Sequence, residues 1–143
     1  MATSALYTLA LRSLVSGDFA WEAGLFKVLL LDSTYVPNQD THRYYSDLTG
    51  QVVGEGYIAG GAEVLGRTIA VDPVTNKITL RCFSPEFPVM TVTPRYAVFY
   101  NDTGTQGASA LLCWWDFGAN VVVTADTLTL TIDVAGLVTA TTP

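Results

Sequence analysis

The polar segment NDTGTQG, residues 101–107, brings together the side chains best suited to bind a ligand. Asp102, Thr103 and Thr105 present oxygen atoms of the kind that hold a calcium ion or a sugar hydroxyl. Calcium takes about six to eight oxygen ligands, whereas this loop supplies one carboxylate and no Asp-x-Asp pattern. We therefore expect no metal site here, and we keep the three residues as candidate loop contacts.

Aromatic residues near this segment suggest a second kind of ligand. A tryptophan beside an aspartate is common in carbohydrate sites, and a sugar-binding module would use Tyr100, Asp102, Trp114 and Trp115. The alternative is structural: the apolar stretches RYAVFY and ALLCWWDF alternate as strands do and flank a tip of turn-forming residues. The sequence favours this second interpretation, a central hairpin that is buried on both faces and tipped by a polar loop.

Catalytic chemistry finds little support in the sequence. His42 is the single histidine, we expect it in an exposed loop, and no G-x-S-x-G motif surrounds a serine. Asp116 with Asp133, or Glu55 with Glu63, would offer paired carboxylates, but nothing in the pattern places either pair across a cleft. We expect no catalytic residues and no cofactor, and hence a protein that is not an enzyme.

The two cysteines, Cys82 and Cys113, each lie in an apolar stretch that resembles a strand. This position favours buried free thiols, although the sequence leaves a disulfide open. A zinc site is not expected, because two thiols and one histidine lack the required ligand spacing.

Glycines gather in the segment GEGYIAGGAEV, residues 54–64. The spacing is not G-x-G-x-x-G, no G-K-[ST] follows, and the next segment has the pattern of a strand rather than a helix. The glycines are therefore expected to provide turns or bulges between strands.

One helix is predicted near the N-terminus, over residues 4–16. Thr3 or Ser4 would cap it and Gly17 would end it. One face would carry Leu6, Leu9, Ala10, Ser13 and Leu14. This face must pack on the sheet or on a neighbouring subunit, so we take Leu6, Leu9 and Leu14 as candidate interface residues. A short helical turn, capped by Asp40 or Thr41, is expected in DTHRYYSDLTG.

Strand patterns dominate the rest of the chain. They cover residues 25–31, 63–72, 77–84, 87–93, 95–102, 108–118 and 127–136, with an edge strand or a loose tail at 137–143. DPVTN, residues 72–76, is a hairpin turn in which Pro73 presets the bend. The prediction is a mainly β protein, an antiparallel β-sandwich or barrel with one N-terminal α-helix, in a single domain over residues 1–143.

Composition limits the partners. The chain carries a net charge of −6 without a basic patch, so direct nucleic-acid contact is not expected. No apolar run approaches the roughly 20 residues of a membrane span, and no leader is recognisable, so we expect synthesis in a cytoplasm and no membrane contact. Only 14% of residues are charged, which suggests that another chain covers part of the surface. Tyr44, Tyr45 and Tyr57 could stack on a ligand or could be half-buried aromatics of an interface, and we keep them as candidate interface residues.

Segment order and two strings resemble a known family. The strings are Gly-Tyr-x-Ala-Gly-Gly at 56–61 and Tyr-Ala-Val-x-Tyr-x-Asp-Thr-Gly-Thr at 96–105, and the similarity of order extends from FKVLLLDSTYVPN to the closing LTIDVAGLVTAT. Nearly the whole chain resembles small structural proteins encoded in the virion gene blocks of tailed bacteriophages. The resemblance implies a component of the virion and leaves head or tail open.

The resemblance, the low fraction of charged residues and the absence of catalytic groups together lead us to expect a capsid decoration or cement protein that acts as a symmetric homo-oligomer, a trimer. Its partners would be further copies of itself and the major capsid protein or other virion proteins. The alternative is a tail-associated protein of the tube, baseplate or fibre, and the more remote one is the carbohydrate-binding module considered above.

Overall fold

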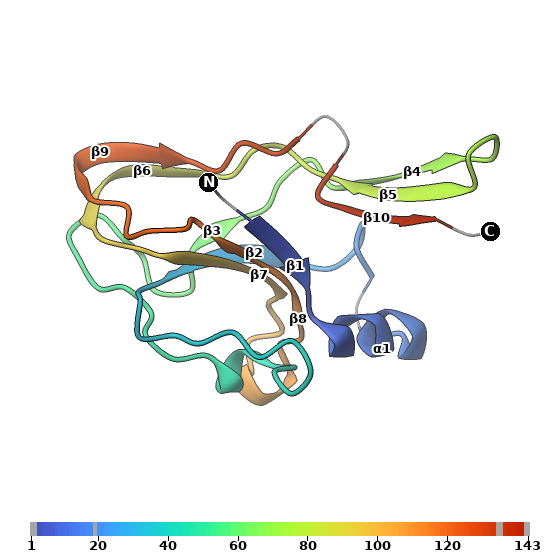
Figure 1. The fold of residues 1–143 in the computed structure, drawn as a ribbon, viewed down its shortest axis with the longest axis horizontal. Coiled ribbons are helices and arrows are strands. Elements are labelled where there is room, and N and C mark those ends of the chain that lie inside the picture. The colour runs from blue at the N-terminus through green and yellow to red at the C-terminus, as the bar shows by residue number, and fades with distance from the viewer. Residues whose placement is uncertain (1–2, 19, 134–135, 142–143) are drawn as a thin grey trace.

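The computed structural model describes residues 3–18, 20–133 and 136–141, which form antiparallel strands and one N-terminal helix (Figure 1). The elements are β1 (Thr3–Leu6), α1 (Thr8–Ser16), β2 (Phe26–Leu31), β3 (Ala62–Glu63), β4 (Thr68–Asp72), β5 (Lys77–Arg81), β6 (Glu86–Val92), β7 (Tyr96–Asn101), β8 (Leu111–Asp116), β9 (Val123–Thr129) and β10 (Val138–Thr141), with short 3-10 turns η1 (Tyr45–Asp47) and η2 (Gln106–Ala108). The predicted mainly β class is confirmed.

A five-stranded antiparallel sheet in the order β1-β8-β7-β2-β3 contains most of the core. β7 lies at its centre, where Phe99 is paired with Val28 on one side and Cys113 on the other. Residues 97–101 and 111–113 are buried without alternation, because both faces of this part of the sheet are covered. The predicted central hairpin is confirmed.

Two smaller sheets complete the fold, and neither closes on the first, so the molecule is sandwich-like rather than a barrel. β6 and β9 form a two-stranded ribbon whose inner side buries Phe87, Met90 and Val123. β4, β5 and β10 form a three-stranded sheet with β5 in the middle. The turn that contains Pro73 joins β4 to β5 as predicted, and the Asp72 carboxylate accepts a hydrogen bond from the Val74 N–H at 3.0 Å.

The N-terminal helix is shorter than predicted. It begins at Thr8, because Thr3–Leu6 is extended and pairs with the free edge of β8, so neither Thr3 nor Ser4 caps the helix and Leu6 is not on its face. The residue before the helix, Tyr7, is extended and fully buried. The C-terminal prediction is confirmed, since Gly17 ends the helix in a left-handed conformation.

The helix packs on the sheet of its own chain. Ala10 and Ser13 are buried, β8 is the strand that α1 contacts, and the Tyr7 N–H at the helix entrance donates to the Leu112 carbonyl at 3.1 Å. Of the two possibilities that the sequence left open, the structure shows the first: the apolar face of the helix packs on the sheet of the same chain.

Other predicted boundaries shift by a few residues. The strand predicted over 127–136 is β9, which lies earlier in the chain, at Val123–Thr129. Leu128 and Leu130 face inward as expected. Residues 134–135 of that prediction lie outside the described residues. Of the predicted segment 137–143, Val138–Thr141 form the edge strand β10, paired with β5. The helical turn is η1, which begins at Tyr45 after the N-cap residue Tyr44, so neither Asp40 nor Thr41 caps it. The backbone N–H groups of Asp40 and Thr41 donate to the Asn38 side chain.

Both cysteines are free thiols, as the sequence favours. Cys113 is buried in β8 and Cys82 is half-buried after β5. Burial raises the pKa of the Cys82 thiol to about 11 and raises that of Cys113 further, so both thiols are protonated at neutral pH.

The glycine-rich segment passes between two sheets at very short range. A Cβ atom on Gly54 or Gly56 would overlap a backbone carbonyl oxygen of β6, and one on Gly61 would overlap the Val28 carbonyl oxygen of β2. The Thr91 N–H of β6 donates to the Glu55 carbonyl at 2.8 Å. The turns predicted for these glycines are present. Glycine is also required because the backbone of this segment lies so close to β6 and β2 that no Cβ atom would fit.

Replacement of Gly61 by alanine should destabilise the fold far more than replacement of Gly104. Both residues have positive φ, +86° and +82°, so both substitutions incur the left-handed penalty of about 1–2 kcal/mol. Gly104 has no atom within 4 Å of the added Cβ, whereas at Gly61 the backbone of β2 must move. Urea unfolding followed by circular dichroism should show a markedly larger loss for Gly61→Ala, or failure to fold. Equal losses would contradict the close approach.

Candidate functional site

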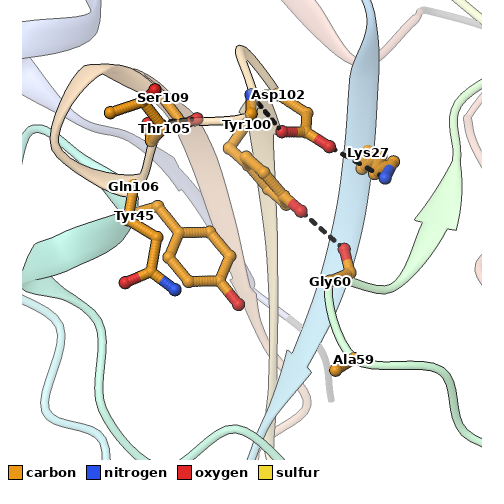
Figure 2. Close-up of a pocket in the computed structure, with 10 residues that line it drawn as sticks. Lys27, Tyr45, Ala59, Gly60, Tyr100, Asp102, Thr105, Gln106 and Ser109 are labelled. Atoms are coloured by element: carbon orange, nitrogen blue, oxygen red, sulfur yellow. Dashed lines mark hydrogen bonds and ion pairs between the residues drawn. The ribbon is translucent and has the colours of Figure 1, made fainter.

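An open depression of about 360 Å³ lies beside the loop that joins β7 to β8 (Figure 2). It is lined by Lys27, Tyr45, Ala59, Gly60, Tyr100, Asp102, Gly104, Thr105, Gln106 and Ser109. Two of the three predicted loop contacts, Asp102 and Thr105, therefore border the same hollow. This depression is the candidate for a ligand site. What it could bind depends on which of its polar groups have no hydrogen-bond partner within the protein.

The carboxylate of Asp102 is engaged on both oxygens. One oxygen lies 2.8 Å from the Lys27 ammonium and the other accepts the Gly104 N–H at 2.9 Å. The hydrogen bond from Lys27, followed by that from Gly104, holds the pKa of Asp102 below its ordinary value. The backbone N–H of Asp102 donates to the Leu25 carbonyl at 2.7 Å, which fixes the loop to the entrance of β2. Asp102 therefore acts as a charged loop anchor in this geometry.

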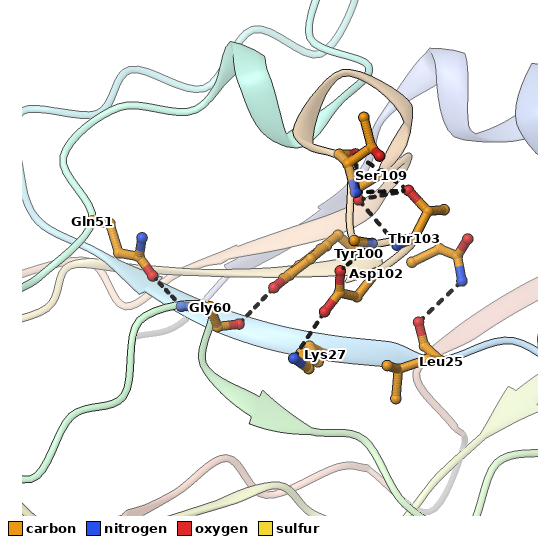
Figure 3. A network of polar contacts seen from close by, with 11 residues as sticks. Leu25, Lys27, Gln51, Gly60, Tyr100, Asp102, Thr103 and Ser109 are labelled. Atoms are coloured by element: carbon orange, nitrogen blue, oxygen red, sulfur yellow. Dashed lines mark hydrogen bonds and ion pairs between the residues drawn. The ribbon is translucent and has the colours of Figure 1, made fainter.

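The hydroxyl groups of the loop bond to the loop itself (Figure 3). The Ser109 hydroxyl donates to the Thr105 carbonyl at 2.9 Å and accepts the Thr103 N–H at 3.1 Å. The Thr103 hydroxyl lies 3.2 Å from the Ser109 hydroxyl and the same distance from the Thr105 carbonyl. Thr103 thus stabilises the turn from within and does not line the depression.

Tyrosines form the apolar wall of the depression. The ring of Tyr45 meets the edge of the Tyr100 ring, with centroids 5.1 Å apart. Tyr100 is buried and donates its hydroxyl hydrogen to the Gly60 carbonyl at 2.7 Å. Burial raises the pKa of Tyr100 above its ordinary value, so the hydroxyl remains a neutral donor.

Gln51 is a polar centre that the sequence analysis missed. Its side-chain oxygen accepts hydrogen bonds from the Tyr57 hydroxyl at 3.0 Å and the Gly60 N–H at 2.7 Å, and its side-chain nitrogen donates to the Tyr45 hydroxyl at 2.8 Å. The Tyr57 hydroxyl also accepts the Leu30 N–H at 3.1 Å, and burial raises the pKa of Tyr57 to about 12. No sequence motif signals this role, since a glutamine between two loops has no characteristic spacing.

The residues of the carbohydrate hypothesis are not brought together. Tyr100 and Asp102 line the depression, whereas Trp114 and Trp115 do not. Trp114 packs against Tyr7 with ring centroids 4.6 Å apart, and Trp115 packs against Phe99 at 5.5 Å. The two tryptophans therefore stabilise the sheet.

His42 is not an exposed loop residue, as the sequence suggested, but half-buried. Its Nδ1 lies 2.8 Å from the Tyr35 hydroxyl, which in turn lies 2.7 Å from the Tyr7 hydroxyl. Burial raises the pKa of Tyr35 to about 12 and that of Tyr7 further. The three side chains form a polar link between the helix entrance and the loop before η1, which local sequence could not indicate.

The predicted interface residues are half-buried: Leu6, Leu9, Leu14, Tyr44, Tyr45 and Tyr57. All except Leu9 pack in part against the core of their own subunit. Their contact with a second subunit stays a prediction. Other apolar residues are more exposed than these, and they are considered below.

Within the described ranges 3–18, 20–133 and 136–141, no three His, Cys, Asp or Glu side chains cluster as metal ligands would. None of the helices described there is long and apolar enough to cross a membrane.

Comparison with family models, with curated proteins and with solved structures finds no match to this chain.

The ion pair between Lys27 and Asp102 should stabilise the fold only above the carboxyl pKa. Because the pKa of Asp102 is lower in the folded than in the unfolded chain, this stabilisation is present at neutral pH and is lost as the pH falls through the folded value. A double-mutant cycle with Lys27→Met and Asp102→Asn should give a coupling of up to about 1 kcal/mol at neutral pH.

Thermal or urea unfolding of the four proteins at several pH values measures this coupling. It should disappear once the pH lies below the folded-state pKa of Asp102, which is itself lower than the ordinary carboxyl pKa, because the carboxyl is then protonated in both states. A coupling that stays constant down to that pH would show that the charge of Asp102 does not contribute.

Proposed function

We propose that this protein is a non-enzymatic structural subunit of a tailed-phage virion, a capsid decoration or cement protein that assembles as a trimer on the outside of the head. The observation that carries the proposal is the apolar surface of the single subunit. Large apolar side chains are exposed on the helix, on loops and on several strands: Leu11, Val15, Leu25, Val36, Val53, Ile58, Leu65, Ile69, Val71, Val74, Ile78, Phe83, Val89 and Val122. We take this amount of exposed apolar surface, in a chain with only 14% charged residues, as support for contact with another protein.

The state of the polar groups around the depression supports a structural role. Asp102, Thr103 and Ser109 hold the loop in place through their own hydrogen bonds and ion pair. A decoration protein needs a firm β body and repeated contacts rather than side chains poised for chemistry. Because many copies attach to one particle, modest individual contacts suffice for stable binding.

The charge of the chain favours the outer surface of a capsid. A net charge of −6 suits a face turned away from packaged DNA, whose phosphates would repel it. The similarity of segment order to virion structural proteins supports a place in the virion, in the head or in the tail. Tail association remains the alternative, and the location on the particle separates the two.

The native mass in solution is the first test. Light scattering coupled to size-exclusion chromatography should give about three times the 15.4 kDa subunit mass at micromolar concentration. A mass of one subunit at every concentration would count against an assembling subunit, since the exposed apolar surface would then have no partner among its own copies.

Binding to particles is the second test. Heads produced by the encoding phage without this gene should take up the purified protein and co-sediment with it in hundreds of copies. Heads that already carry the protein are the matched control and should take up none. Failure to co-sediment at any salt concentration would contradict the decoration role, and density on the tail in electron cryomicroscopy would replace it by the tail role.

A further inference from the structure

A chain of hydrogen bonds joins the entrance of α1 to the loop of residues 35–42. The Tyr7 hydroxyl lies 2.7 Å from the Tyr35 hydroxyl, which lies 2.8 Å from Nδ1 of His42. Tyr7 and Tyr35 are 0% and 1% exposed, so bulk water does not reach their hydroxyl groups. Each hydroxyl hydrogen therefore needs an acceptor within the protein, because a buried donor without a partner destabilises the fold.

The direction of these bonds follows from a third contact of the His42 ring. The backbone N–H of Asn38 lies 3.3 Å from the same Nδ1. A peptide N–H can only donate, so Nδ1 carries a lone pair and the ring proton is on Nε2. The Tyr35 hydroxyl then donates to Nδ1, and the Tyr7 hydroxyl donates to the Tyr35 oxygen. With a neutral imidazole, both buried hydroxyl hydrogens have an acceptor.

A proton on Nδ1 reverses this chain and leaves one buried hydrogen without an acceptor. The new N–H can only donate, so the Tyr35 oxygen must accept it and the Tyr35 hydrogen must turn toward Tyr7. The Tyr7 hydrogen then has no acceptor, since Tyr35 is the one partner that the described residues give this hydroxyl. The Asn38 N–H loses Nδ1 as well. Uptake of one proton therefore leaves two donors unpaired, one of them in the interior.

The groups packed around the two tyrosines offer no other acceptor. Trp114 of β8 packs on Tyr7 with ring centroids 4.6 Å apart, and Tyr96 of β7 meets Tyr35 at 5.6 Å. Burial, followed by neighbours that include Cys113 for Tyr7 and Tyr96 for Tyr35, raises the pKa of both hydroxyls. Neither hydroxyl can therefore relieve the conflict by losing its own proton at neutral or acid pH.

Charged groups near the imidazole lie on three elements. Asp40 and Arg43 belong to the same stretch of chain, and Arg43 is paired with Asp18 at 2.8 Å. Asp47 of η1 contributes, after burial, to the raised pKa of both tyrosines, and α1 carries the exposed Arg12. The carboxylates favour a charged imidazole and the guanidinium groups oppose it. These charges set the pH at which the ring takes up its proton, but among the described residues none of them bonds to either tyrosine hydroxyl.

We propose that His42 is a pH-sensitive latch, which holds residues 35–42 on the entrance of α1 while its ring is neutral and releases them when Nδ1 is protonated. Two further bonds join these segments: the Thr8 N–H donates to the Gln39 carbonyl at 3.0 Å, and the Thr8 hydroxyl donates to Asp40 at 3.3 Å. Thr8 is exposed, so water replaces both bonds once the buried chain is broken. The latch is a property of the single subunit and does not depend on the proposed virion role.

The pH dependence of stability is the first test. The unfolded chain binds the proton on Nδ1 more readily than the folded chain, so folding becomes less favourable as the pH falls. From about pH 7.5 to about pH 5.5 the unfolding constant of the wild type should rise several-fold, up to about tenfold, the limit for an ordinary imidazole in the unfolded chain. Urea unfolding followed by tryptophan fluorescence measures this change.

His42→Asn is the matched control, because His42 is the single histidine and the asparagine side-chain oxygen supplies an acceptor near the place of Nδ1 that does not titrate. Its unfolding constant should change far less over the same pH range. An equal rise in the wild type and in His42→Asn would overturn the latch.

Amide hydrogen exchange of the native protein locates the release. After correction for the intrinsic rate, the Thr8 N–H of the wild type should exchange markedly faster at about pH 5.5 than at about pH 7.5, whereas amides of β2 and β7 in the main sheet keep their protection. In His42→Asn the Thr8 N–H should show no such change.

Should His42→Asn fail to fold, nitrogen NMR of the wild-type imidazole decides instead. The latch requires an unprotonated Nδ1 at neutral pH and loss of Thr8 protection as the ring becomes charged. A proton on Nδ1 at neutral pH, or a Thr8 amide that stays protected after the ring is charged, contradicts the proposal.

Discussion

The fold depends on the backbone of residues 51–64, which crosses between the main sheet and the β6–β9 ribbon at distances that only glycine permits. At one end the Val52 N–H bonds to Leu30, and at the other the Val64 N–H bonds to Phe26, so both ends are attached to β2. Between them Gly56 lies against β6 and Gly61 lies against β2. One short segment therefore sets the distance between two layers, and side chains larger than hydrogen at these points would push the layers apart.

The candidate depression depends on the same crossing. Gly60 presents its carbonyl to Tyr100 and its N–H to Gln51, so the floor of the hollow is backbone held by buried side chains. On the other side, Asp102 is fixed by Lys27 of β2. The polar groups that the sequence suggests for ligand binding, such as the Asp102 carboxylate, instead hold loops against strands. Such use is expected in a protein with few charged side chains, because each buried polar group needs a partner.

Periodicity predicted the fold class and most strands, because alternating and continuously apolar segments report which faces are covered. Periodicity gave the wrong result at the N-terminus. The pattern of residues 3–6 is compatible with a helix, but these residues form a strand because they pair with the free edge of β8. It also failed for His42 and Gln51, whose partners come from distant parts of the chain. Asp102 and Thr105, predicted as loop contacts, line the depression, and their contact with a ligand stays a prediction. Composition could not indicate that Lys27 would form an ion pair with the Asp102 carboxylate. Nor does an apolar face reveal what covers it, and so the exposure of Val71 and Val74 required the structure.

The sheet of β4, β5 and β10 must keep its shape although much of its apolar surface is exposed to water. Ile69, Val71 and Ile78 are β-branched, which favours extended backbone, and cross-strand pairs between them contribute to the stability of this sheet. The Trp21 indole fixes its base, because the indole N–H lies within hydrogen-bond distance of the Thr68 and Arg81 carbonyls. Pairing within the sheet and attachment at its base therefore hold these strands in place even where Val71 and Val74 are largely exposed.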